Sequence, residues 1–211
     1  MRVVQFISLT FIFYINISFA GISDSVKNLK PVKVFVSDDF ESKGAVVSDY
    51  GSERWAGVTI NKIGIIENIN GGTHEGLAKY NPSNDKGSKY VLSFMAKPDG
   101  RSNLRLTVFY KNLDSWRGIR NRNYSFMNID KMEFKLAGGH GAIDHEIKKK
   151  RDGWVHCYFL FEADVEYHNE KELVFAFHLM NDPENTKLRY QGDALGLVLG
   201  DMKLYNIESE Q

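Results

Sequence analysis

The sequence predicts an all-β fold of two packed antiparallel sheets, and three observations support this. Apolar and polar residues alternate with a period of two in eight segments, the pattern of half-buried strands. Turn-forming stretches such as PDGRS, KKRDG and NDPEN separate these segments. No long segment combines the 3.6-residue apolar period of an amphipathic helix with end caps. Eight strands with turn signals between them favour a two-sheet β-sandwich.

The predicted strands run from residue 32 to residue 207. In order they are VKVFV (32–36), WAGVTI (55–60), KYVLSFMAK (89–97), SNLRLTVFY (102–110), KMEFKL (131–136), GWVHCYFLF (153–161), ELVFAFHLM (172–180) and LGLVLGDMKLYNI (195–207). Two long stretches between them, 68–88 and 111–125, are predicted to be irregular connections. Long loops on a rigid sandwich often carry binding residues.

The first 20 residues predict an export signal. Arg2 precedes a long apolar run, and Ser18 and Ala20 are small residues at positions −3 and −1 before Gly21. Tyr14 and Asn16 interrupt the run, which is shorter than the ~20 residues of a membrane span. We therefore expect an exported protein, periplasmic or extracellular, without a membrane span. The expected organisation is a signal (1–20), a leader (21–31), one β-sandwich domain (32–207) and a short tail (208–211).

Charge and cysteine content narrow the classes of function. The chain has 27 Lys and Arg against 27 Asp and Glu, and loss of Arg2 with the signal leaves 26 against 27. This balance argues against a broad basic surface for nucleic acid. Cys157 is the only cysteine, so no intramolecular disulfide can form. It belongs to the apolar alternation of WVHCYFLF, which predicts a buried structural thiol rather than a nucleophile.

The last predicted strand contains an unexpected carboxylate. On a period of two, Asp201 shares one face with Leu195, Leu197 and Leu199. Burying an unpaired carboxylate among leucines would be costly. Asp201 is therefore exposed, bulged outward beside Gly200, or paired with a cation.

Five segments, in this order, resemble the motifs of jelly-roll carbohydrate-binding modules, a β-sandwich family with the galactose-binding type of fold. They are SDDFESKG, RWAGV, KYVLSFMAKPDGRSNLRLTVFY, DGWVHCYFLF and YQGDALGLVLGDMKLYNI. The resemblance covers most of residues 32–207 and extends to related domains of phage tail proteins. It implies a secreted, lectin-like protein that binds a polysaccharide or glycan without catalysis.

The resemblance also implies a structural calcium ion. In such modules a glutamate after the early Phe and an acidic residue on the last strand commonly hold calcium, and these positions match Glu41 and Asp201. Calcium prefers several oxygen ligands and could join the two ends of a sandwich that lacks disulfides. Met202 stands where a second acidic residue often follows. The alternatives are that both carboxylates are exposed, or that Asp201 pairs with a lysine.

The candidate ligand-binding residues come from strand phase and from the resemblance. In SNLRLTVFY and LVFAFHLM the larger apolar sets suit the core, which leaves Arg105, Phe109 and His178 outside. The resemblance places these two strands in one concave sheet, so the three side chains would face its groove, with Trp116 as a flanking wall. An aromatic ring beside a planar guanidinium matches the apolar face and hydroxyl rim of a sugar. Alternatively, Arg105 and His178 are ordinary solvated residues.

An enzyme and an adhesion protein are the competing classes. A jelly-roll polysaccharide lyase could use Tyr110, His178 and Arg105 as base and charge-neutralising groups. A glycoside hydrolase needs two carboxylates whose separation the sequence does not reveal. His140 and His145 are five residues apart, which is a weak metal-ligand spacing. The sequence has no nucleophile elbow and no phosphate-binding glycine loop.

Overall fold

The computed structural model describes residues 21–43, 45–55, 58–67, 75–81, 89–112, 115–136, 142–162, 171–180 and 196–207. They form a four-residue helix, α1 (Ile22–Ser25), a short 3-10 turn, η1 (Ser37–Asp39), and two antiparallel sheets. The strands are β1 (Lys33–Val34), β2 (Phe40–Lys43), β3 (Ala45–Trp55), β4 (Val58–Glu67), β5 (Glu75–Tyr80), β6 (Lys89–Asp99), β7 (Asn103–Asn112), β8 (Ser115–Asn128), β9 (Glu133–Leu136), β10 (Ala142–Lys149), β11 (Val155–Glu162), β12 (Lys171–Leu179) and β13 (Gly196–Asn206).

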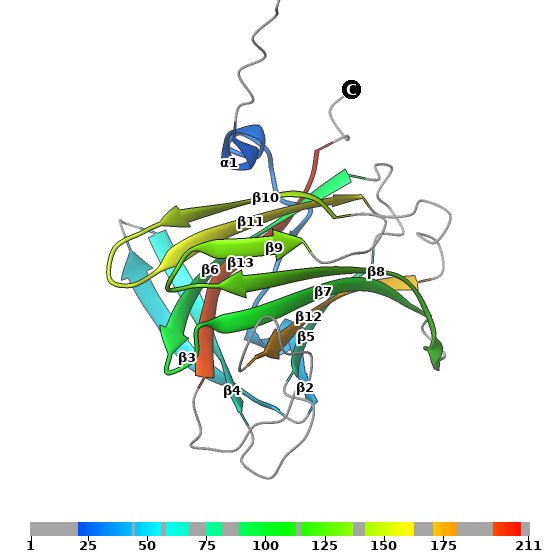
Figure 1. Ribbon diagram of the computed structural model, residues 1–211, viewed down its shortest axis with the longest axis horizontal. Helices are drawn as coiled ribbons and strands as arrows, with labels where there is room; N and C mark the ends of the chain where they lie inside the picture. The colour runs from blue at the N-terminus through cyan, green and yellow to red at the C-terminus, as the bar shows by residue number, and fades with distance from the viewer. Residues whose placement is uncertain are drawn as a thin grey trace, which may run out of the picture.

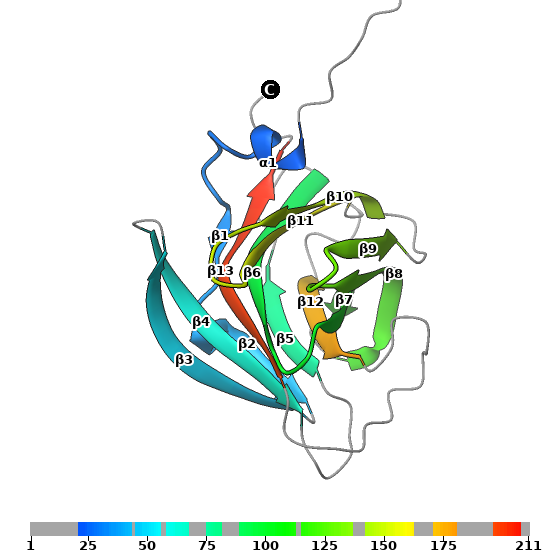
Figure 2. The ribbon, with the colours of Figure 1, turned by 60° about the vertical axis from the view of Figure 1, so that its left-hand side comes forward.

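The predicted sandwich is confirmed. One sheet has the strand order β10-β11-β6-β13-β4-β3, with β1 also paired to β13, and is called the seven-stranded sheet (Figure 1). The other has the order β2-β5-β12-β7-β8-β9 and is called the six-stranded sheet. Figure 2 shows the two sheets as separate layers. No helix in the described part of the chain is long and apolar enough to cross a membrane.

The main core lies between the inner faces of the two sheets. On β12, Leu173, Phe175, Phe177 and Leu179 all face this core, as the alternation predicts. Ring contacts connect the sheets: Phe177 meets Phe94 of β6 edge to face, with centroids 5.3 Å apart. Cys157 is also buried in this core, and burial raises the pKa of its thiol far above the ordinary value. The predicted burial of this thiol is confirmed.

Three predicted segments differ from the structure. WAGVTI is not one strand, because β3 ends at Trp55 and β4 begins at Val58. Stretch 111–125 is not an irregular loop, because most of it belongs to β8, which pairs along β7. Stretch 68–88 includes β5, which pairs with β2 and β12. In the stretches 68–88 and 111–125, neighbouring strands satisfy the backbone of a segment without clear apolar alternation.

The leader and the 150–154 turn both lie against the outer face of the seven-stranded sheet. α1 lies beside β10 and β11, near the end of β13 (Figures 1 and 2). The turn Lys150–Trp154 has positive φ at Asp152 and Gly153 and is closed by the Lys150 N–H donating to the Trp154 carbonyl, 2.8 Å. Trp154 is 1% exposed and packs in a separate cluster with Ile60, Met95 and Val198.

Candidate functional site

The outer face of the six-stranded sheet, turned away from the main core, carries most of the predicted ligand-binding residues. In the ladder between β7 and β12, Arg105 is directly opposite His178, and Phe109 is opposite Val174. Residues paired across an antiparallel ladder point to the same face. The strand phase therefore puts Arg105, Phe109 and His178 together on one face.

Burial changes the expected role of the aromatic ring. Phe109 is 7% exposed and packs in a small cluster with Leu77, Val174 and Ala176. His178 is 6% exposed, whereas Arg105 is only partly buried. Phe109 thus forms part of a packed apolar floor rather than an open platform, and Arg105 is the most exposed residue of the three.

Two other candidates from the sequence, Trp116 and Tyr110, are placed by the pairing of their strands alone. Trp116 belongs to β8, which pairs with β7 from the Asn112–Ser115 end of the ladder, but its side chain lies outside the described part of the chain. Tyr110 pairs with Leu173 on β12, whereas Arg105 pairs with His178, so Tyr110 is out of phase with the other two. The backbone register therefore does not align the three residues of the lyase alternative on one face.

Glu41 also belongs to the outer face of the six-stranded sheet. It pairs with Leu77 on β5, a member of the outer apolar cluster, whereas its neighbour Phe40 packs against the main core. The exposed carboxylate of Glu41 forms an ion pair with the ammonium of Lys79. A charged pair thus borders the apolar floor along its β2 and β5 edge.

Asp201 lies in a bulge and also pairs with a cation, which are two of the three possibilities that the sequence left open. The ladders of β13 shift register between Gly200 and Lys203, and Asp201 has φ 43°, so this residue is in a β-bulge. Its carboxylate lies 2.6 Å from the ammonium of Lys203. Asp201 also contributes to raising the pKa values of Tyr158 and Tyr205, behind the larger effect of burial. These tyrosines pack outside the main core, so Asp201 belongs to the outer face of the seven-stranded sheet.

The two carboxylates do not fit a shared calcium site. Glu41 is on the outer face of one sheet and Asp201 is on the outer face of the other, and packed sheets are about 10 Å apart. Each carboxylate already contacts a lysine. Among the described residues, no group of three or more His, Cys, Asp or Glu side chains is arranged to hold a metal ion. Calcium binding by this pair stays a prediction of the resemblance that these contacts do not support.

We expect metal removal to leave the fold unchanged. With Lys79 and Lys203 neutralising the two carboxylates, excess chelator should not change the melting temperature of the purified protein, and Asp201→Asn should respond like the parent. Thermal unfolding with chelator, and again after calcium is restored, is the measurement. A chelator-induced fall in Tm that Asp201→Asn abolishes would contradict this expectation, because a bound ion stabilises only the folded state.

A polar network on the outer face of the seven-stranded sheet was not found by sequence reasoning. His156 shares hydrogen bonds with Ser93 Oγ at Nε2, 2.7 Å, and with Tyr158 Oη at Nδ1, 2.9 Å. The His156 and Tyr158 rings stack with centroids 4.2 Å apart. Burial, and then the charges of nearby lysines, lower the pKa of His156 to about 3. The only sequence signal was the outward phase of His156 between Val155 and Cys157.

Of the remaining histidine pair, the structure describes His145 alone. His145 stacks on Phe134 of β9 with ring centroids 3.9 Å apart, and partial burial, opposed by Asp144, lowers its pKa. His140 lies outside the described residues. Trp55 is partly buried against the Trp154 cluster, and the ammonium of Lys150 is 5.3 Å from the centre of its ring.

No protein-family model matches this chain, and no curated protein matches its sequence. The solved structures found to be similar each have a TM-score below 0.5. One is the enzymatically active domain of tailspike protein 4 of bacteriophage CBA120, with 6% identity, a TM-score of 0.43, and coverage of 79% of this chain and 18% of that chain. A second is a Clostridium thermocellum endo-1,4-beta-D-xylanase with its carbohydrate-binding module, complexed with xylohexaose: 11% identity, TM-score 0.46, and 83% and 28% coverage.

A third match is a carbohydrate-binding module that recognises mannan. It has 13% identity and a TM-score of 0.39, with coverage of 87% of this chain and 91% of that one. This chain spans 18% and 28% of the length of the first two structures, which contain catalytic parts.

Proposed function

We propose that the protein is exported and binds a polysaccharide or glycan, without cleaving it, on the outer face of the six-stranded sheet. The observation that carries this proposal is the pairing of Arg105 with His178 beside the apolar cluster that contains Phe109. A planar charged donor is thereby fixed next to a hydrophobic floor.

The chemistry of this face suits a sugar ring. The ring of a sugar has an apolar face of C–H groups and a rim of hydroxyls. The residues of the apolar floor are 0–7% exposed, so the floor offers the C–H groups only a small contact, and the guanidinium of the partly buried Arg105 is the planar donor for the hydroxyls. Because His178 is mostly buried, its role is to support Arg105 and to offer one ring edge. Trp116 on β8 is the proposed flanking wall.

The test begins with a glycan array and continues with calorimetric titration of the best hit. Arg105→Ala should weaken binding about 10- to 100-fold, because hydrogen bonds to a charged group contribute about 1.5–3 kcal/mol. Arg105→Lys keeps the charge but loses the planar fork, and should recover only part of this affinity. Trp116→Ala should cost about 1 kcal/mol of binding free energy. Arg54→Ala, an exposed position on β3 of the seven-stranded sheet, is the matched control and should bind normally.

Two results would redirect the proposal. Release of new reducing ends, or ultraviolet absorbance of unsaturated uronate, that disappears in His178→Ala would identify a lyase or hydrolase. Binding that is unaffected in both Arg105→Ala and Trp116→Ala would place the glycan site on another surface. Each variant needs a melting curve, since a loss of binding through misfolding would be misleading.

A further inference from the structure

The leader makes specific contacts that a simple polar linker does not need. Ile22 and Val26 are 8% and 5% exposed, and they pack with Val91 of β6 and Tyr158 of β11. The carbonyl of Gly21 accepts hydrogen bonds from the backbone N–H groups of Asp24, 2.8 Å, and Ser25, 3.3 Å. Residue 21 therefore has a defined position against the outer face of the seven-stranded sheet.

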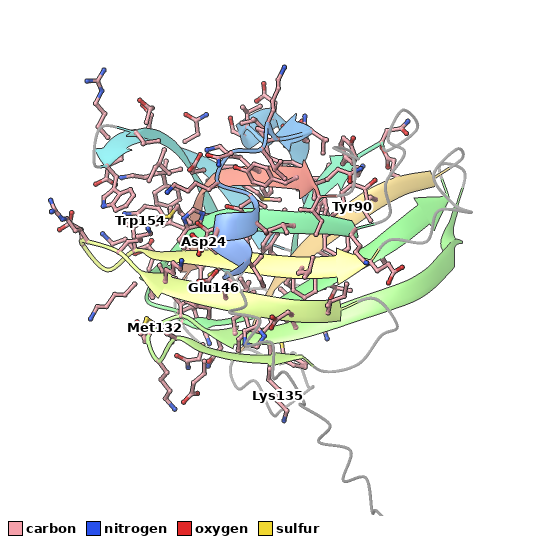
Figure 3. All side chains as sticks on the ribbon, turned by 90° about the horizontal axis from the view of Figure 1, so that it is seen from above. Asp24, Tyr90, Met132, Lys135, Glu146 and Trp154 are labelled. Atoms are coloured by element: carbon pink, nitrogen blue, oxygen red, sulfur yellow. The ribbon has the colours of Figure 1, made fainter. Side chains whose placement is uncertain are left out.

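Glu146 on β10 is the acidic residue that meets the start of the leader. Its Oε2 accepts the backbone N–H of Ser23 at 2.8 Å, and its Oε1 is 2.9 Å from the ammonium of Lys148. Lys148 in turn donates to the hydroxyl of Ser23. Figure 3 shows α1 lying across the strands with Glu146 beside it. The carboxylate thus connects α1 to the sheet by hydrogen bonding.

Gly21 itself lies against this carboxylate. A Cβ atom added to Gly21 would be 2.9 Å from Oε1 and 3.1 Å from Oε2 of Glu146. The backbone nitrogen of Gly21 is bonded to the same Cα atom, two bonds from that position. Glycine suits this position, because any larger side chain would occupy the space next to the carboxylate.

We propose that Glu146 is the binding site for the amino terminus that export creates. A signal peptidase would hydrolyse the Ala20–Gly21 peptide bond with water, leaving a carboxylate on Ala20 and an amine on Gly21 that takes up a proton. The resulting α-ammonium pairs with the Glu146 carboxylate and fastens the leader to β10. The precursor has an uncharged amide nitrogen at this place and lacks the ion pair. The processed protein is therefore more stable than any form extended at Gly21.

The test is a two-by-two comparison of melting temperatures. A form beginning at Gly21 is compared with a form beginning at Phe19, each released from a fusion partner by a protease that leaves that residue first. Each is made with Glu146 and with Glu146→Gln. With Glu146, the two-residue extension should lower the Tm by about 2–4 °C, the shift typical of one modest interaction in a chain of this size. In the Glu146→Gln variant the extension should have little effect. Glu133→Gln, which removes an exposed carboxylate on β9, should behave like the parent.

A second measurement tests the cleavage itself. The whole sequence, including its first 20 residues, is expressed and exported. The exported protein should then have the mass and amino-terminal sequence of a chain that begins at Gly21. A different mature terminus overturns the proposal. An extension that does not lower the Tm of the Glu146 protein, or that lowers it equally with Glu146→Gln, also overturns it. If Glu146→Gln does not fold, the comparison within the Glu146 protein decides alone.

Discussion

Replacing Phe177 by alanine should lower the free energy of unfolding by about 3–5 kcal/mol, the usual cost of removing a large aromatic side chain from a core. Phe177 is fully buried and meets Phe94 of the opposite sheet edge to face, with centroids 5.3 Å apart. It also contacts Phe40, 6.4 Å away between centroids. The substitution therefore removes packing that joins the two sheets, as well as buried apolar surface.

Denaturant unfolding followed by tryptophan fluorescence measures this loss. Phe177→Leu is the matched control, because it keeps most of the volume and should cost less than half as much. Similar losses in both variants would mean that ring geometry, rather than the volume of the cavity, dominates at this position. A loss below about 1 kcal/mol in Phe177→Ala would contradict the placement of Phe177 in the main core.

The strands with strong alternation were predictable, and those without it were not. β6, β7, β11, β12 and β13 were all recognised from sequence, because one face of each lies in the main core. β8 and β10 were missed. The sequence of β10, AIDHEIKK, is largely charged, and that of β8 begins SWRGIRNRN. β10 is a strand because it pairs with β11, and β8 because it pairs with β7. Such pairing depends on residues outside the segment itself.

The phase of the candidate site was predictable, but its burial was not. Alternation alone put Arg105 and His178 on the same side of their strands, and the ladder places them opposite each other. The exposed fraction of a side chain, however, depends on how neighbouring strands cover it. Phe109 is 7% exposed because Leu77, Val174 and Ala176 pack around it. Residues from three strands form this cluster, and no local pattern indicates which of them meet.

For the acidic residues too, the sequence indicated the local conformation but not which side chains meet in space. The sequence identified the conflict at Asp201 and offered a bulge or a cation as a solution, and the structure has both. The resemblance paired Asp201 with Glu41 around calcium. Strand phase and the two lysine contacts separate them instead. Transferring the calcium-ligand role to Glu41 and Asp201 assumes that the two residues lie as they do in the family. That arrangement depends on the strand register within two different sheets.

His156 should make the protein lose stability between about pH 6.5 and pH 3. In the folded state burial, together with Lys150, Lys203 and Lys148, lowers its pKa to about 3, and Glu146 opposes this only in part. In the unfolded chain the imidazole has its ordinary pKa of 6.5. Between these values the unfolded state binds the proton and the folded state does not. Stability is therefore full above pH 6.5 and falls as the pH is lowered, by an amount on the order of a few kcal/mol.

His156→Gln tests this directly, because glutamine is neutral at every pH and can still hydrogen bond to Ser93. The free energy of unfolding is measured by denaturant titration at intervals from pH 7.5 to pH 4. The parent should lose more stability over this range than His156→Gln, so the two curves converge as the pH falls. The partner groups Ser93 and Tyr158 do not titrate here, since burial raises the pKa of Tyr158 to about 12. His145→Gln is the control, because His145 is less buried and should contribute a shallower slope. Parallel curves for the parent and His156→Gln would show that the imidazole titrates alike in both states, and the buried Ser93–His156–Tyr158 network would then be wrong.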